Sequence, residues 1–206
     1  MDLEARWYGL SMHGSREAAA EGWSRIQQHY TEPVRAYHNL EHLDELFRWA
    51  DSLDGELQRP ELVHWAIYFH DIIYLPGSGN NEDLSADVAE QLLPNLGVEA
   101  ADVATIATWI RATKSHSLSP EATIPDAELF LDMDLAVLGA RTRRYQRYAQ
   151  QVREEYREFS DLLYKPGRRK VLEHFLAKDR IFQSEILHQL LDAQARKNLR
   201  WELESL

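Results

Sequence analysis

Two adjacent residues, His70 and Asp71, combine an imidazole and a carboxylate within the most apolar stretch of the chain, residues 62–75. An ionised carboxylate in apolar surroundings is strongly destabilising unless it is paired or binds a cation. A metal ion lying over this segment could accept a ring nitrogen from one residue and a carboxylate oxygen from the other. A buried His–Asp hydrogen bond without a metal is the alternative, so the pair alone leaves both interpretations open.

A second pair of histidines, His38 and His42, is spaced four residues apart, as are neighbours on one face of a helix. Asn39 is a favourable N-cap, and a helix that begins after it leaves His38 on the preceding loop and puts His42 in the first turn. That placement can aim one imidazole at a metal and the other at a substrate. Two surface histidines at a helix start are the alternative.

The third set of candidate ligands is a pair of carboxylates, Asp132 and Asp134, in a leucine-rich helical segment. Two residues apart on a helix, they point roughly 160° away from each other, so we expect one to face inward. Surface acids on a helix are the alternative. A mixed imidazole and carboxylate donor set suits a divalent ion of manganese, iron, zinc or magnesium, and ligand type does not choose among them.

Three further residues are secondary candidates. Glu82 opens a predicted helix after the loop 76–80 and could act as the base for an attacking water, or it is an ordinary acid favoured by the helix dipole. His116, in the polar segment 113–117, could bind a second metal or a phosphate, or it is an exposed loop histidine. Arg168 belongs to a basic cluster that could receive anionic substrate groups, or that forms a solvated helix face.

The elements that must position these residues are helices. Apolar residues recur with helical periodicity, Pro and Gly separate the segments, and no run of β-branched residues predicts a strand. We therefore expect one all-α domain over residues 1–206. The predicted helices are 2–11, 15–30, 39–53, 60–74, 82–94, 99–112, 126–138, 141–159, 166–178 and 180–204. Helix 60–74 is apolar on all sides, so it is expected at the centre of the domain, with His70 and Asp71 inside it.

Composition limits the classes of function. The 206 residues include 23 basic and 34 acidic side chains, a net charge of −11, which excludes a general nucleic-acid binder but not a small phosphorylated ligand. The chain has no cysteine, so any metal must bind to His, Asp and Glu. We expect no signal peptide, no membrane span and a cytoplasmic location. The amphipathic stretch 183–204 could pack on the bundle or mediate a homodimer.

Several short motifs, taken in order, resemble those of the HD superfamily, and most closely a small bacterial group of predicted metal-dependent HD phosphohydrolases. They are Tyr-His-Asn-x-x-His at 37–42, Phe-His-Asp-x-x-Tyr at 69–74, Asn-Glu-x-x-Ser-Ala at 81–86, Thr-x-x-His at 113–116 and Asp-x-Asp-Leu-x-x-Leu-Gly at 132–139. Arg153-x-Glu155-Tyr156 and Tyr164-x-x-Gly167-Arg168 extend the resemblance, which covers about residues 35–170.

The resemblance implies an all-α HD fold with four metal ligands, His42, His70, Asp71 and Asp134. Asp134 is preferred over Asp132 because a leucine follows it, although the two could be exchanged. The segment 37–42 also resembles the signature of cyclic-nucleotide phosphodiesterases, which implies that His38 is the proton donor. The chain departs from those enzymes at residues 43–46 and shows no nucleotide-selecting glutamine, so only related metal chemistry is implied.

Residues and resemblance together predict a metal-dependent phosphohydrolase acting on a small phosphorylated or nucleotide-like substrate. One alternative is a di-iron oxygenase of the HD fold. A ferritin-like carboxylate site has some basis in the pairs Glu61/His64 and Glu185/His188, which both fit Glu-x-x-His. A third alternative is a metal-binding or nucleotide-binding protein without catalytic activity.

Overall fold

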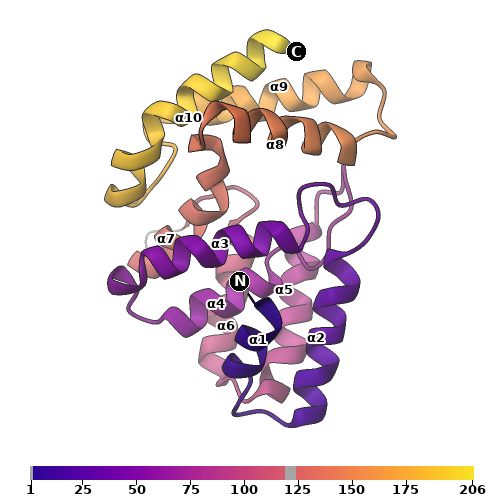
Figure 1. Ribbon diagram of the computed structural model, residues 1–206, viewed down its shortest axis with the longest axis vertical. Coiled ribbons are helices and arrows are strands. Elements are labelled where there is room, and N and C mark those ends of the chain that lie inside the picture. Colours follow the sequence, from indigo (N-terminus) through magenta and orange to yellow (C-terminus); the bar gives the residue numbers. More distant parts are fainter. Residues whose placement is uncertain (1, 119–123) are drawn as a thin grey trace. The chain divides into compact units, whose positions relative to one another are not determined.

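The computed structural model describes residues 2–118 and 124–206, and its regular structure is helical throughout, with no strand in those ranges (Figure 1). The predicted all-α class is confirmed. The chain divides into two compact units, Met1–Leu131 and Asp132–Leu206, called unit 1 and unit 2 below. The expectation of one domain stays a prediction beside this division. Among the described residues, no helix has the length and hydropathy that a membrane span requires.

The described residues of unit 1 form six complete helices and most of a seventh. They are α1 (Leu3–Leu10), α2 (Arg16–Tyr30), α3 (Leu40–Ser52), α4 (Pro60–Phe69), α5 (Asn81–Leu92), α6 (Ala100–Ala112) and α7 (Pro125–Leu135), with short 3₁₀ turns at Asp54–Glu56 and Leu93–Leu96. Side-chain caps fix several of the starts: Asp2, Ser15 and Asn39 each accept a backbone N–H of the first turn. The predicted cap at Asn39 is confirmed.

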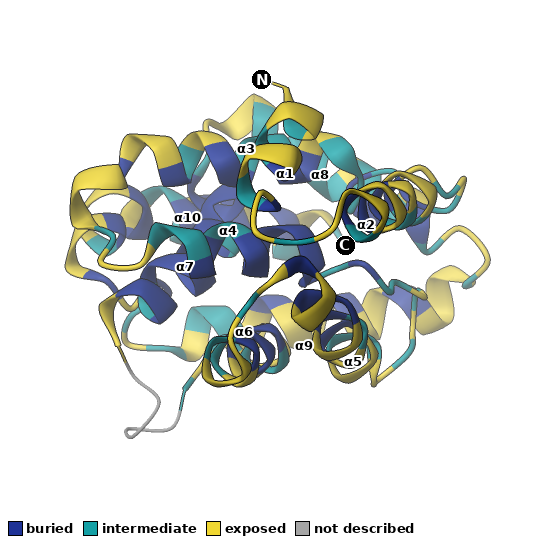
Figure 2. Cartoon of the chain, turned by 90° about the horizontal axis from the view of Figure 1, so that it is seen from below, coloured by how far each residue is buried: buried dark blue, intermediate teal, exposed yellow. Residues whose placement is uncertain are grey.

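The core of unit 1 forms around α4, most of which is buried (Figure 2). The fully buried Trp7 of α1 places its ring edge-on to Trp65 and Tyr68, at centroid distances of 5.4 and 5.1 Å. Such T-shaped aromatic contacts add to the free energy gained by burying the rings. The central position predicted for this helix is therefore confirmed, and it gives the residues that follow α4 a rigid base.

The prediction of a helix over 60–74 is wrong at its end, because α4 stops at Phe69 and His70 and Asp71 lie in the turn that follows. In a longer helix the Ile67 carbonyl would accept the backbone N–H of Asp71. Here that carbonyl lies 2.9 Å from His70 Nδ1, and the Asp71 N–H donates instead to the hydroxyl of Tyr30, at 3.2 Å. The His70 side chain and the distant Tyr30 hydroxyl thus replace the helical bond, and the helix ends.

Unit 2 begins within the last turn of α7 and continues with a 3₁₀ turn at Ala136–Gly139 and the helices α8 (Thr142–Glu155), α9 (Asp161–Ala177) and α10 (Glu185–Ser205). The 3₁₀ turn packs against α10 so closely that a Cβ on Gly139 would lie 2.5 Å from the Cβ of Leu191, which only glycine avoids. Asn198 of α10 donates to the carbonyls of Leu138 and Ala140, both at 2.8 Å.

Three predicted boundaries in unit 2 are wrong. α8 ends at Glu155 rather than at 159. α9 starts at Asp161 rather than at 166, with Pro166 inside it; the carbonyl that Pro166 cannot bond belongs to Leu162, which lies at the exposed surface where water can reach it. α10 starts at Glu185 rather than at 180, because the Ser184 side chain caps it by accepting the Leu187 N–H.

Candidate metal centre

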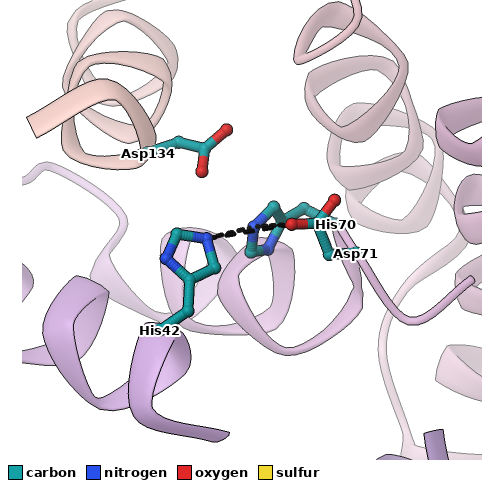
Figure 3. Close-up of side chains that lie close together, drawn as sticks. All are labelled: His42, His70, Asp71 and Asp134. Carbon is teal, nitrogen blue, oxygen red and sulfur yellow. Dashed lines mark hydrogen bonds and ion pairs between the residues drawn. The ribbon is translucent and has the colours of Figure 1, made fainter. Parts of the chain in front are cut away.

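Three predicted ligands of unit 1 meet where α3 begins and α4 ends (Figure 3). His42 lies in the first turn of α3, as the Asn39 cap requires, and it is 2% exposed. His70, 1% exposed, and Asp71 come from the turn after α4. Although 28 residues separate the two histidines, their Nε2 atoms are 3.1 Å apart.

The distances within this cluster fit a shared ion. Asp71 Oδ2 lies 3.1 Å from His70 Nε2 and 3.8 Å from His42 Nε2. Two ligand atoms about 2.1 Å from one ion, at angles of about 90–110°, are themselves about 3.0–3.4 Å apart. The two shorter distances match that spacing. The side chain of Asp71 is 16% exposed, so the carboxylate marks the side of the cluster that reaches solvent.

The contacts of His70 fix which of its nitrogens can bind a metal. Its Nδ1 lies 2.9 Å from the Ile67 carbonyl oxygen, which can only accept a hydrogen bond. Nδ1 therefore carries the proton, and Nε2 directs its lone pair toward His42 and Asp71. A backbone carbonyl behind a ligating imidazole is a common way to fix the tautomer and ring orientation at metal sites.

A buried cation, Arg35, holds the backbone behind the ligands. Its guanidinium donates to the carbonyls of His38, Asp71 and Ile72, at 3.0, 2.6 and 2.9 Å. The side chain is fully buried. Sequence reasoning misses this residue, because two of its three acceptors are backbone atoms 36 and 37 residues further along the chain, and backbone acceptors carry no residue-type signature.

His38 lies on the loop before α3, as predicted, and beside the cluster. Its ring stacks on Tyr74, with centroids 4.2 Å apart and planes 26° apart, and it meets the His42 ring nearly edge-on at 6.0 Å. Stacking on Tyr74 restricts the rotation of the His38 imidazole while leaving its ring edge directed away from the stack. The structure thus brings His38 near the three ligands.

Glu82 lies in the first turn of α5. Hydrogen bonds hold the start of this helix to residues 73–75, the segment that follows His70 and Asp71. Ser85 Oγ accepts the Ile73 N–H at 3.0 Å, and the Asn81 amide exchanges hydrogen bonds with both backbone groups of Leu75, at 3.0 and 3.1 Å. Glu82 Oε2 is buried and has no hydrogen-bond partner within residues 2–118 and 124–206. A buried carboxylate oxygen of this kind is suited to accepting a proton or a water.

The remaining candidates come from other segments of the chain. His116 is half-buried in the turn after α6, in a left-handed conformation with φ of 46°. Asp134 is half-buried in the last turn of α7, on the unit 2 side of the division. Asp132 is fully buried within unit 2 and accepts the N–H groups of Gln183 and Ser184, at 2.8 and 2.7 Å, so it fixes the start of α10.

Arg168 is not on a solvated helix face but forms a buried ion pair in unit 2. Its Nε and Nη2 donate to the two carboxylate oxygens of Glu202, at 2.7 and 3.0 Å. Tyr145 donates its hydroxyl to the same carboxylate at 2.5 Å, and the guanidinium lies over the Tyr148 ring. Burial, and then the Glu202 carboxylate, raise the pKa of Tyr145, so its hydroxyl remains a donor.

The Glu-x-x-His pairs of a ferritin-like site have other partners. Glu61 pairs with Arg59, and Glu185 pairs with Arg180. Within the described ranges, none of these glutamates or their histidines belongs to a group of side chains close enough to share an ion.

The chain matches no protein-family model, no curated protein and no solved structure. The resemblance to the HD superfamily therefore stays an expectation.

Proposed function

We propose that the protein is a metal-dependent phosphohydrolase acting on a small phosphorylated or nucleotide-like substrate. The observation that carries the proposal is the convergence of two imidazole nitrogens and one carboxylate oxygen, of His42, His70 and Asp71, at 3.1–3.8 Å in a mostly buried setting. Nitrogen and oxygen donors of this kind suit a divalent ion of manganese, iron, zinc or magnesium. The chemistry of the donor set therefore fits the ion that the resemblance implies.

Asp134 is the fourth ligand in this proposal. Phe130, four residues earlier on α7, contacts the ring of His70 edge-on at a centroid distance of 6.0 Å. Residues four apart lie on the same face of a helix, so Asp134 shares one face of α7 with Phe130. Asp132 lies on another face and is engaged by Gln183 and Ser184, which supports Asp134 over Asp132.

In this proposal His38 and Glu82 carry out the two proton transfers of the hydrolysis. A bound divalent ion would polarise a phosphoryl oxygen and lower the pKa of water. His38, held beside His42 by its stack on Tyr74, donates its ring proton to the departing oxygen of the ester. Glu82 accepts the proton of the attacking water at Oε2, on the helix that follows the ligand turn. A small substrate agrees with the net charge of −11, which disfavours a polyanion.

Elemental analysis of gently purified protein tests the metal site. We expect about one divalent ion per chain in the wild type and none in His70→Ala. His188→Ala is the matched control, because it removes an imidazole that pairs with a neighbouring aspartate, Asp192, in unit 2. No ion in the wild type after incubation with each metal would refute the proposal. Iron together with oxygen consumption would instead establish the oxygenase alternative.

The role of His38 has its own test. We expect His38→Ala to retain the metal and to lose about 10²–10⁴-fold in turnover, the usual contribution of a general acid. The loss should be larger for an alkyl phosphate ester than for a nitrophenyl ester, whose leaving oxygen needs no proton. Release of the metal by His38→Ala, or equal losses for both esters, would show that the assigned role is wrong.

A further inference from the structure

Arg35 joins the two chain segments that carry the candidate site. It lies on the loop before α3, and its three carbonyl acceptors belong to His38 on that loop and to Asp71 and Ile72 in the turn after α4. Its Nε donates to Glu32 Oε2 at 3.0 Å. One planar guanidinium thus bonds to four groups at once, a geometry that a lysine ammonium cannot reproduce.

Aromatic contacts restrict the guanidinium further. Its Cζ lies 5.0 Å from the centroid of the Tyr30 ring and 5.5 Å from that of Tyr74. The hydroxyl of Tyr30 accepts the N–H of Asp71, and the ring of Tyr74 stacks on His38. Both rings that contact the cation therefore also touch a residue of the candidate site, and the cation–π contacts favour a charged guanidinium between them.

We propose that Arg35 is a positioning residue, which sets the backbone of Asp71 against that of His38 and so fixes the distance between the metal site and the proton donor. The proposal rests on the proposed function, since the ligands and the donor are assigned there. Arg35 touches neither ion nor substrate; it acts through the carbonyl groups of residues that do. Outer partners of this kind typically change metal affinity 10–100-fold.

Unit 2 supplies a matched control in Arg196. This residue also places Nε on a carboxylate, that of Asp192 at 2.6 Å, and donates to three backbone carbonyls, those of Leu176, Lys178 and Asp179 at 3.3, 2.8 and 2.8 Å. Its carbonyl acceptors lie in the last turn of α9 and in the connection from α9 to α10, which carry no candidate site residue. Arg35 and Arg196 thus make the same kinds of hydrogen bond, but only Arg35 makes them beside the candidate ligands.

The test compares Arg35→Lys with Arg196→Lys by calorimetric titration of Mn²⁺ and of Zn²⁺, with urea unfolding to match their stabilities. We expect Arg35→Lys to weaken metal binding about 10–100-fold and Arg196→Lys to leave it within about twofold of the wild type. Unchanged affinity in Arg35→Lys would overturn the proposal. Equal losses in both variants would also overturn it, because the effect would then be one of general stability.

Amide hydrogen exchange separates a failure of this inference from a failure of the proposed function. We expect Arg35→Lys to speed exchange at the amide of Asp71, which bonds to Tyr30, while the buried amides of α4 keep their protection. If the wild type binds no metal, the proposed function fails, and faster exchange at Asp71 still supports Arg35 as the residue that positions this turn. Unchanged exchange at Asp71 would overturn that role.

Discussion

Each unit of the protein buries a cluster of polar side chains, and the two clusters differ in the atoms that meet. In unit 2, Arg168 and Tyr145 donate three hydrogen bonds to Glu202, so a cation and a hydroxyl face a carboxylate. In unit 1, two imidazoles and a carboxylate, of His42, His70 and Asp71, bring potential metal-binding atoms together. Donors meet acceptors in the first cluster, whereas potential ligands meet one another in the second.

The difference shows that burial of charge does not by itself identify a functional site. Arg168 and Glu202 are as deeply buried as many catalytic residues, with 8% and 6% of their side chains exposed. Each group satisfies the charge and the hydrogen-bonding capacity of the other, so the burial of this pair is accounted for without a ligand. The three donors of the unit 1 cluster could share one cation, which is why the proposed chemistry is assigned to these residues.

The largest effect on stability is expected from breaking the unit 2 cluster. Glu202→Ala leaves the buried guanidinium of Arg168 without its carboxylate, which should cost about 3–5 kcal/mol in the free energy of unfolding. Urea unfolding measures the loss, and elemental analysis should find the metal content unchanged. The double variant Arg168→Met/Glu202→Leu should recover most of the stability, because no unpaired charge is left. A Glu202→Ala protein that folds but lacks metal would contradict the comparison.

Removing the metal should destabilise the protein through the loss of its bonds to the ligands. At a free metal concentration of about 100 times the Kd, binding adds about 2.7 kcal/mol to the free energy of unfolding. A chelator should therefore lower the urea midpoint of the wild type and should have no effect on His42→Ala. Arg196→Lys serves as the control and should respond to the chelator as the wild type does. Equal responses of His42→Ala and the wild type would place the metal elsewhere.

Asp132 and Asp134, two residues apart, should show opposite behaviour. Asp132→Ala removes the acceptor of the Gln183 and Ser184 N–H groups, and we expect it to cost about 2 kcal/mol while leaving metal binding intact. Asp134→Asn should cost little stability and should weaken metal binding. Urea unfolding and metal titration of both variants test this prediction. Loss of metal binding in Asp132→Ala, with loss of stability in Asp134→Asn, would make Asp132 the ligand and Asp134 the structural residue.

The sequence predicts most of what positions the ligands. Helical periodicity gives the all-α class, and the Asn39 cap places His42 in the first turn of α3. It does not predict where α4 ends, because the periodic pattern continues through residue 74 while the hydrogen bonds that stop the helix come from Tyr30 and Arg35. Those partners lie more than 30 residues away and can be found only once the chain has folded.

The division into units is equally invisible in the sequence. It falls between Leu131 and Asp132, inside a segment whose helical periodicity runs without interruption. The role of Arg168 is missed for a related reason: its position in a run of basic residues predicts a solvated face, and only the packing of α9 against α10 brings Glu202 to it. Local patterns predict elements, whereas partners of buried charges depend on packing.

The smallest expected effect concerns His64, a half-buried imidazole of unit 1 outside the cluster, whose ring lies 5.4 Å from that of Phe47. Burial, and then the charge of Arg6, lower its pKa, while the carboxylates of Asp51, Asp54 and Glu61 act in the opposite direction. The folded state thus binds the proton less readily than the unfolded chain. Its contribution to stability is present above the ordinary pKa of 6.5 and is lost as the pH falls below it.

We therefore expect the wild type to lose more stability than His64→Gln between about pH 7 and pH 5, since glutamine does not titrate. Urea unfolding of both proteins across this range measures the difference, which isolates His64 from the other titrating groups. Metal content should be the same in both, because among the described residues His64 belongs to no group of side chains close enough to share an ion. Loss of metal in His64→Gln would mean that burial of an imidazole, rather than the convergence of donors at His42, His70 and Asp71, marks the site.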